Sequence, residues 1–274
     1  MQAVRIRMDV IEGTYHAKSG HPGGSLSVSD IMAYLYFYKM NVDPENPDWE
    51  KRDRFVLSKG HTAPALYGAL ALKGFFPESE IARLRKPDSF LQGHPSLRMT
   101  PGVDMSTGSL GQGISAAVGM ALGAKLNGDD YKVYTVLGDG EVQEGQVWEA
   151  AMFAAAKKLD NLIAVVDNNN LQIDGTLEDV NSPYPIDEKF AAFGWNVVNC
   201  DGNDFDEIDA AFTAAEQHNG KPSVIVAKTI KGKGVSFMED QVGWHGKAPK
   251  QEEYDQAMKE LKDRLSELET AATE

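Results

Sequence analysis

The segment VLGDGEVQEGQVWEA (136–150) and its continuation LIAVVDNNN (162–170) determine the predicted fold. Residues 132–137 alternate in polarity and are rich in β-branched side chains, and residues 162–167 form a short apolar run, so both are predicted strands. The alanine-rich residues 143–159 predict a helix between them. A strand–helix–strand unit requires parallel strands, and it therefore places both carboxyl ends at one edge of the sheet.

That edge is where open α/β sheets bind ligands, and two polar side chains are predicted to lie there. Asp139 follows the first strand and Asn169 follows the second. A carboxylate, an amide and nearby backbone carbonyls are hard oxygen ligands, which suit Mg²⁺ or Ca²⁺ holding a diphosphate. Gly138 and Gly140 let the backbone approach phosphates without an intervening Cβ. Alone, GDG is commonly a turn and NNN a polar loop, but their pairing across one crossover is more specific.

Composition limits the class of protein. The chain has 274 residues, a net charge of −14 and 42% hydrophobic residues, which predicts a folded domain and argues against nucleic-acid or anionic-membrane surfaces as partners. Cys200 is the only cysteine, so an internal disulfide is excluded. The first residues lack the apolar core of a signal peptide, and the apolar run 31–38 is too short to span a membrane. We therefore expect a cytoplasmic protein.

The pattern along the chain predicts an α/β fold, doubly wound, with a mostly parallel sheet and helices on both faces. SGHPGGSLS (19–27) is predicted to be a loop, with Ser27 or Ser29 capping a helix over residues 31–40. Residues 111–116 fit a dinucleotide-binding fingerprint, but no strand is predicted before them, which argues against an NAD site. Further strands are expected at 54–57, 196–199 and 223–229, and helices at 1–18, 114–126, 187–193, 205–218 and 251–268.

Four of the six histidines stand in glycine- or proline-rich loops or at a helix start, namely His21, His61, His94 and His245. Rigid loops of this kind hold polar groups over pockets, so these four are candidate site residues. His245 lies in residues 228–249, a connection long enough to indicate a functional loop.

Seven segments, taken together and in this order, resemble transketolase: GHPGG (20–24), SKGH (58–61), GHP (93–95), GSLGQG (108–113), GDG with EG (138–145), NNNLQIDG (168–175) and GWHGKAP (243–249). The resemblance covers nearly the whole chain. It implies the fold of thiamine-diphosphate enzymes and the transfer of a two-carbon ketol unit from a ketose phosphate to an aldose phosphate through that cofactor.

The resemblance also implies roles for individual residues. Asp139, Asn169 and the Leu171 carbonyl would bind Mg²⁺, for which Ca²⁺ or Mn²⁺ can substitute. Other cofactor contacts would come from His61, His245, Gly108, Leu110, Gly138, Asp139, Gly140 and Asn169. His21 and His94 would face the substrate, His245 would also assist proton transfer, and Glu144 would couple the aminopyrimidine glutamates across a dimer interface.

A full transketolase has three domains, whereas residues 1–274 correspond to the diphosphate-binding domain alone. The resemblance therefore implies a split transketolase, in which a second chain carries the pyrimidine-binding and C-terminal domains and two copies of each chain assemble as α2β2. Three alternatives stay open. They are a related enzyme acting on an unusual sugar, the α subunit of a 2-oxo acid dehydrogenase, and a non-catalytic scaffold. The 2-oxo acid dehydrogenase would share GDG and NN but not the paired GHP segments or GWHGKAP.

Overall fold

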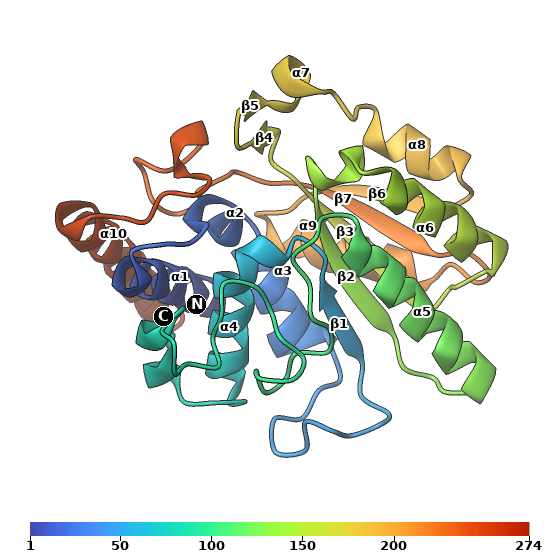
Figure 1. Ribbon diagram of the computed structural model, residues 1–274, viewed down its shortest axis with the longest axis horizontal. Helices are drawn as coiled ribbons and strands as arrows, with labels where there is room; N and C mark the ends of the chain where they lie inside the picture. Colours follow the sequence, from blue (N-terminus) through green and yellow to red (C-terminus); the bar gives the residue numbers. More distant parts are fainter. Residues whose placement is uncertain (274) are drawn as a thin grey trace.

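The computed structural model describes residues 1–273, which form an α/β fold around a five-stranded sheet (Figure 1). Every neighbouring pair of strands is parallel. The strands lie in the order β1 (Arg54–Leu57), β2 (Val133–Gly138), β3 (Leu162–Asn168), β7 (Ser223–Lys228) and β6 (Asn196–Asp201). The predicted fold class is confirmed, and the predicted strands differ from the observed ones by two residues at most.

Helices cover both faces of the sheet because side chains on successive strand residues point to opposite sides. Tyr134 and Val136 of β2 belong to one buried cluster, and Val133 and Leu137 belong to the other. The first cluster includes α1 (Gln2–Ala17), α2 (Pro22–Ser27), α3 (Ser29–Tyr34), α4 (Ala63–Lys73), α9 (Phe205–Glu216) and α10 (Gln251–Ala271). The second includes α5 (Gln112–Asn127), α6 (Gly145–Ala156) and α8 (Ile186–Ala192).

The remaining regular structure consists of short segments. A π-helical turn, η1 (Leu35–Lys39), continues α3. The 3₁₀ turns are η2 (Gly60–Thr62), η3 (Glu78–Arg83), η4 (Glu141–Gln143) and η5 (Val242–Trp244), and a small hairpin of β4 (Leu171–Gln172) and β5 (Gly175–Thr176) leads into α7 (Leu177–Val180).

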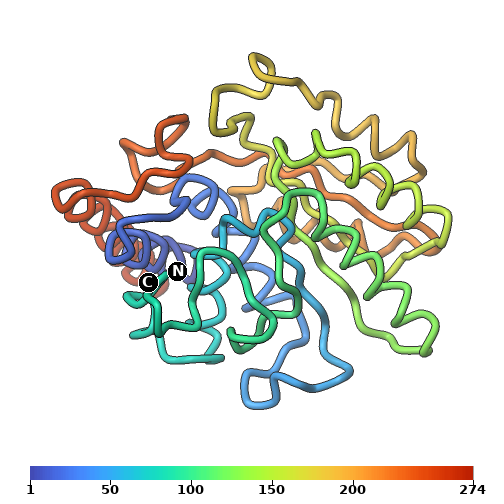
Figure 2. Tube along the Cα trace, in the orientation of Figure 1, coloured from blue at the N-terminus to red at the C-terminus, as the bar shows by residue number. Residues whose placement is uncertain are grey.

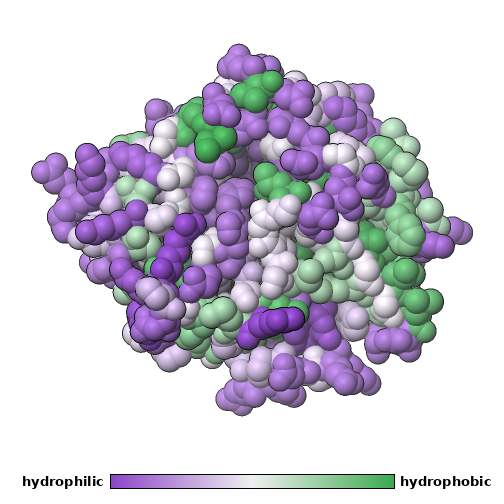
Figure 3. Space-filling model, viewed as in Figure 1, coloured by the Kyte–Doolittle hydropathy of each residue, from purple (hydrophilic) through white to green (hydrophobic). Residues whose placement is uncertain are grey.

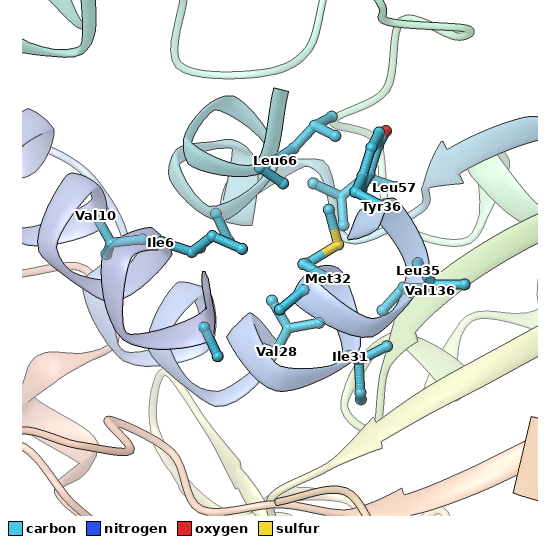
Figure 4. Packing of buried hydrophobic residues seen from close by; sticks show 14 of the residues in the cluster. Ile6, Val10, Val28, Ile31, Met32, Leu35, Tyr36, Leu57, Leu66 and Val136 are labelled. Atoms are coloured by element: carbon cyan, nitrogen blue, oxygen red, sulfur yellow. The ribbon is translucent and has the colours of Figure 1, made fainter. Parts of the chain in front are cut away.

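The N-terminal third of the chain forms a helical layer on the first face. In Figure 4, Ile6 and Val10 of α1, Met32 of α3 and Leu66 of α4 point into a common interior. The first and last helices lie side by side (Figure 2), and Arg5 of α1 forms an ion pair with Glu269 of α10 at 3.8 Å. The buried side of α1 is therefore explained by packing against α4 and α10.

The prediction of a loop at residues 19–27 is wrong, because Pro22–Ser27 forms the short helix α2. Proline at the first helical position already has a helical φ angle, so it starts this helix. The glycines allow close packing: a Cβ at Gly23 would lie 2.8 Å from the Trp244 carbonyl oxygen, and one at Gly24 would lie 3.0 Å from Thr62.

The predicted caps Ser27 and Ser29 are also not observed. The Ser27 hydroxyl donates to Asp167 at 2.6 Å and to the Gly24 carbonyl, and the Ser29 hydroxyl donates to the Ser25 carbonyl. Each hydroxyl is therefore used inside the fold and does not begin the following helix.

The topology opens a crevice at the carboxyl edge of the sheet. The chain leaves β1 and β7 toward the face of α4 and α10, and it leaves β2 and β3 toward the face of α6 and α8 (Figure 1). Such divergence of neighbouring connections is the usual position of a ligand site in an open α/β sheet. No helix within residues 1–273 is long and apolar enough to cross a membrane.

One buried acid in α1 lacks a partner. Asp9 is 6% exposed, and its Oδ2 accepts no hydrogen bond from residues 1–273. It packs closely against α4, because a Cβ at Gly68 would lie 3.1 Å from the Cβ of Asp9. Burial, together with Glu78 and Glu12, raises the pKa of Asp9 to about 8. The folded state therefore holds a proton that the unfolded state releases near pH 4.

We predict that Asp9→Asn stabilises the protein at pH 8 by on the order of 1 kcal/mol or more, with the difference shrinking toward pH 4. The wild-type free energy of unfolding should fall as the pH rises from about 4 to about 8, because only the unfolded state gains the stabilisation of the free carboxylate. Urea unfolding across this range measures both. Asp174→Asn, at an exposed position of the β4–β5 hairpin, is the control. Parallel pH profiles for wild type and Asp9→Asn would contradict the assignment.

Candidate active site

The loops after β2 and β3 meet through one carboxylate. Asp139 is 3% exposed, and its two oxygens accept the N–H groups of Gly140 at 2.8 Å and Asn170 at 2.5 Å. Burial and the nearby Asp167 raise the pKa of Asp139 to about 6, although the two N–H groups oppose this shift. The predicted convergence of the two strand ends is therefore present in the structure.

Two further oxygens lie in the same loop after β3. Asn169 is 8% exposed, and its Oδ1 accepts the Leu171 N–H at 3.2 Å. The Leu171 carbonyl oxygen accepts a hydrogen bond from the Lys231 ammonium at 2.7 Å. A cationic group thus already faces one of the oxygens predicted to bind metal.

The β3 end is anchored by a buried charge network. Asp167 is completely buried and forms an ion pair with Lys59, which is 2% exposed and follows β1. Asp167 also accepts hydrogen bonds from Ser27 of α2, from Thr229 after β7 and, at 3.4 Å, from the Asn169 amide. Four elements are joined at this one carboxylate, and Asn169 is oriented by it.

Three of the predicted histidines come together across the crevice. The His21 and His61 ring centroids are 5.1 Å apart, those of His21 and His245 are 5.4 Å apart, and those of His61 and His245 are 5.5 Å apart. The Lys231 ammonium lies 2.9 Å from the His245 Nδ1, so it links this cluster to the Leu171 carbonyl. Residues at the start of α2, in η2, after η5 and in the loop after β7 therefore lie together. Through Lys231 they adjoin the oxygens predicted to bind metal.

Burial and nearby cations keep this cluster neutral. Burial, with Arg85, lowers the pKa of His21 to about 4, and burial, with Lys231, lowers that of His245 to about 3. Burial and Lys59 hold the pKa of His61 well below its usual value. Burial and Lys59 also lower the pKa of Lys231 to about 8. Positive charge is crowded here, so an anion bound among these groups would relieve the repulsion.

His94 lies at a second loop and contacts the glycine-rich segment before α5. A Cβ at Gly108, where φ is +147°, would lie 2.9 Å from the His94 ring, so only glycine permits this contact. Gly111, the residue before α5, donates its N–H to Glu141 at 2.9 Å. The segment 108–113 is therefore fixed against both His94 and the loop after β2.

Glu141 joins three loops and was not singled out from the sequence. It is 2% exposed and accepts hydrogen bonds from Ser58 at 2.5 Å, from Gly111 at 2.9 Å and from Gly138 at 3.0 Å. Its position directly after the GDG segment could have identified Glu141 as a candidate site residue. The predicted residue Glu144, in contrast, is exposed and precedes α6 beside Gly111, and Leu110 is 36% exposed.

Two lysines also escaped the sequence prediction. Lys59 and Lys231 are each 2% exposed and lie just beyond the carboxyl ends of β1 and β7. The strand-end argument that selected Asp139 and Asn169 applies equally to them, because all four residues follow neighbouring parallel strands. Buried cations beside neutral histidines indicate an anionic ligand.

The residues present fit a divalent cation and a diphosphate. Asp139, Asn169 and the Leu171 carbonyl form an all-oxygen donor set of the kind that Mg²⁺ and Ca²⁺ prefer. A cleft of about 580 Å³ adjoins them, lined by residues of the β3 and β7 ends including Asn168, Asn170, Tyr184 and Thr229. Two buried nitrogens beside the site have no partner within residues 1–273, namely Nδ1 of His21 and Nε2 of Gln172. These unpaired nitrogens provide hydrogen-bonding capacity for a polar ligand.

Comparison with known protein families gives one match over nearly the whole chain. The family described as "Transketolase, thiamine diphosphate binding domain" matches residues 1–265. The chain is 49% identical to a 6-deoxy-6-sulfo-D-fructose transketolase subunit of Clostridium sp. (strain MSTE9), with 95% of this chain and 94% of that protein covered. It is 43% identical to an apulose-4-phosphate transketolase subunit of Phocaeicola vulgatus, with 98% and 95% covered.

Solved structures agree with this similarity. The transketolase of Campylobacter jejuni superposes with a TM-score of 0.90 at 35% identity, and the match covers 95% of this chain. The same match covers 42% of the Campylobacter protein, so this chain spans about two fifths of that transketolase.

We predict that the imidazoles of His21 and His245 stay neutral down to about pH 5, because their pKa values are about 4 and about 3. The histidine C2 protons in NMR spectra recorded from pH 8 to pH 5 measure this. Lys231→Met should raise the pKa of His245, since Lys231 is the main charge that lowers it. Lys51→Met, at an exposed position, should leave it unchanged. Midpoints near 6.5 for both rings in the wild type would refute this electrostatic description.

Proposed function

Because the chain belongs to the transketolase family as its thiamine-diphosphate-binding domain, we propose that it is the cofactor-binding subunit of a two-chain transketolase. The assembled enzyme would move a two-carbon ketol unit from a ketose to an aldose phosphate. The observation that carries this proposal is the meeting of Asp139, Asn169 and the Leu171 carbonyl with Lys231 and the neutral histidine cluster.

In this proposal Asp139, Asn169 and Leu171 would hold Mg²⁺, for which Ca²⁺ or Mn²⁺ can substitute, and a divalent cation there would neutralise the charge of the cofactor's diphosphate. Gly138 and Gly140 allow the backbone to approach the phosphates, and Lys231 turns its ammonium from the Leu171 carbonyl to the anion. His61 and His245 bind beside the diphosphate. Bound thiamine diphosphate supplies a nucleophilic carbon and an electron sink for breaking and remaking a carbon–carbon bond next to a carbonyl.

The chain's other site residues act on the substrate and on the cofactor's ring. Neutral His21 and His94 each have one nitrogen that donates and one that accepts, which suits hydrogen bonding to sugar hydroxyls and to a developing alkoxide. Gly108 and Leu110 contact the aminopyrimidine. Glu144, exposed at the start of α6, is available to a second protomer.

We propose that a partner chain completes the enzyme. The two relatives described above are themselves named as transketolase subunits and match this chain along almost their full length. Hydrophobic side chains gather over α5 and α6 at the right of Figure 3, where Leu126, Met152 and Phe153 are exposed. These side chains lie in the C-terminal halves of the two helices, whose first residues border the site. We propose that this surface contacts the chain carrying the pyrimidine-binding and C-terminal domains. We propose an α2β2 assembly in the cytoplasm.

The sugar carries an anionic group in this proposal. The relatives at 49% and 43% identity are named for a sulfonated ketose and for a ketose phosphate, respectively. The chain therefore suits a phosphorylated or sulfonated ketose as the donor. Assay of the assembled enzyme with both kinds of donor distinguishes between them.

We predict that Asp139→Ala abolishes Mg²⁺-dependent retention of thiamine diphosphate in the assembled enzyme, because the metal loses its only carboxylate ligand from this chain. Isothermal titration calorimetry with and without Mg²⁺ measures the binding. Asp130→Ala, an exposed acid preceding the amino end of β2, is the matched control and should bind as wild type does. Wild-type cofactor affinity and activity in Asp139→Ala would disprove the metal assignment.

We predict that His94→Ala lowers kcat by on the order of 100-fold while leaving the Kd for thiamine diphosphate nearly unchanged, because His94 is proposed to face the sugar. Steady-state kinetics and calorimetry on the same preparation separate the two effects. His218→Ala, an exposed histidine after α9, is the control. Loss of cofactor binding in His94→Ala would move His94 from the substrate to the diphosphate.

A further inference from the structure

Arg85 occupies a constrained position between the two Gly-His-Pro segments, residues 20–22 and 93–95. Its φ angle is +59°, in the left-handed region that side chains other than glycine seldom adopt. The Arg85 N–H donates to the Leu91 carbonyl at 2.7 Å, which holds this backbone in place. Its guanidinium Nη1 donates to the Ser19 hydroxyl at 3.0 Å, two residues before His21.

The same guanidinium lies against the second segment. A Cβ at Gly93 would lie 2.8 Å from the Arg85 Cζ and 2.9 Å from its Nη2, so any larger residue directly before His94 would displace the guanidinium from this position. Tyr67 of α4 supports the segment as well, because its hydroxyl donates to the carbonyls of Gln92 and His94 at 2.9 and 3.0 Å. Arg85 therefore contacts Gly93, directly before His94, and Ser19, two residues before His21.

The charge of Arg85 is not neutralised by a neighbour. Across residues 1–273 no carboxylate lies within 4.0 Å of its guanidinium, and its buried Nε has no acceptor. Two other shielded arginines do have such partners: Arg7 pairs with Asp30 at 2.6 Å and Arg52 with Asp104 at 2.5 Å. Arg54, which has no carboxylate partner either, donates to the backbone carbonyls of Arg52 and Glu50. An unpaired guanidinium beside two histidines therefore needs an explanation other than an ordinary ion pair.

We propose that Arg85 is a positioning residue of the active site, whose guanidinium joins the two Gly-His-Pro segments and fixes His21 and His94 relative to each other for hydrogen bonding to the sugar. The role in sugar binding rests on the proposed transketolase function. Arg85 itself does not contact the reacting atoms in this proposal. The planar fork of an arginine suits the task, because it donates in several fixed directions at once, which a lysine cannot do.

The position of the charge supports this role. Besides burial, Arg85 is the largest influence that lowers the pKa of His21 and of His94. His94 and Lys231 add to the effect on His21, whose ring also faces those of His61 and His245. Arg85 thus adds to the effect of burial in favouring the neutral form of both histidines, and a neutral imidazole retains the acceptor that a sugar hydroxyl requires.

Four variants of the full chain, assembled with its partner, test the proposal. Arg85→Met removes both the positive charge and the planar set of N–H donors, and Arg85→Lys keeps the positive charge alone. Gly93→Ala leaves Arg85 in the sequence but places a methyl group where the guanidinium lies. Arg83→Met is the matched control, since Arg83 pairs with Glu80 and Asp88 on the exposed side of η3.

We expect Arg85→Met and Gly93→Ala to lower kcat by on the order of 10- to 100-fold, as misplacement of a reacting group does. NMR titration of the histidines should show the pKa values of His21 and His94 raised in Arg85→Met and close to wild type in Arg85→Lys, although Arg85→Lys stays slow. Arg83→Met should match wild type in both measurements. If Arg85→Met only destabilised the protein, its melting temperature would fall while the pKa values of His21 and His94 stayed as in wild type.

Wild-type kcat in Arg85→Met, or histidine titrations unchanged from wild type in that variant, would overturn the proposal. The NMR readout requires neither cofactor nor substrate. If the wild-type assembly showed no ketol transfer, the proposed function would fail. The role of Arg85 would still be decided by the NMR titrations: unchanged pKa values of His21 and His94 in Arg85→Met would overturn it, and raised values would support it.

Discussion

The buried ion pair between Lys59 and Asp167 is the interaction on which the rest of the site depends. Asp167 ends β3 at full burial, and it brings together the residue after β1, the helix α2 and the loop after β7. Removing one partner from such a pair costs about 3–5 kcal/mol, because the other charge is left uncompensated in the interior. The pair also fixes the neighbouring site residues, because the Asn169 amide donates to Asp167 and His61 follows Lys59 by two residues.

The electrostatics of the crevice oppose those of the whole molecule. The chain has a net charge of −14, yet the interior of the site gathers Lys59, Lys231 and a cluster of neutral histidines. Low exposure strengthens the field of these cations, so an anion is attracted there although the outer surface is acidic. Three buried acids offset part of this positive charge. Asp167 pairs with Lys59, and Glu141 accepts hydrogen bonds from Ser58 and two backbone N–H groups. The Asp139 carboxylate is held by two backbone N–H groups and stays available for a divalent cation.

Site residues could be predicted from the sequence where they directly follow a predicted strand. Asp139 and Asn169 follow strands of a single strand–helix–strand unit, so their proximity could be predicted. Arg85 could not be placed in this way, because it follows no strand and its contact with Ser19 joins positions 66 residues apart. Lys231 lies beyond the end of β7, so the same inference could have found it. The helix α2 was missed for a different reason. Its glycines indicated a loop, whereas their function is close packing against Trp244 and Thr62.

The most direct test of the central claim is a crystal structure of the chain, assembled with its partner, in the presence of thiamine diphosphate and Mn²⁺. Anomalous diffraction locates Mn²⁺ without reference to any assumed ligand. We expect one anomalous peak bounded by a carboxylate oxygen of Asp139, the Asn169 Oδ1 and the Leu171 carbonyl, with diphosphate oxygens completing the coordination. A peak elsewhere, or a cofactor whose diphosphate lies away from Asp139 and Lys231, would contradict it.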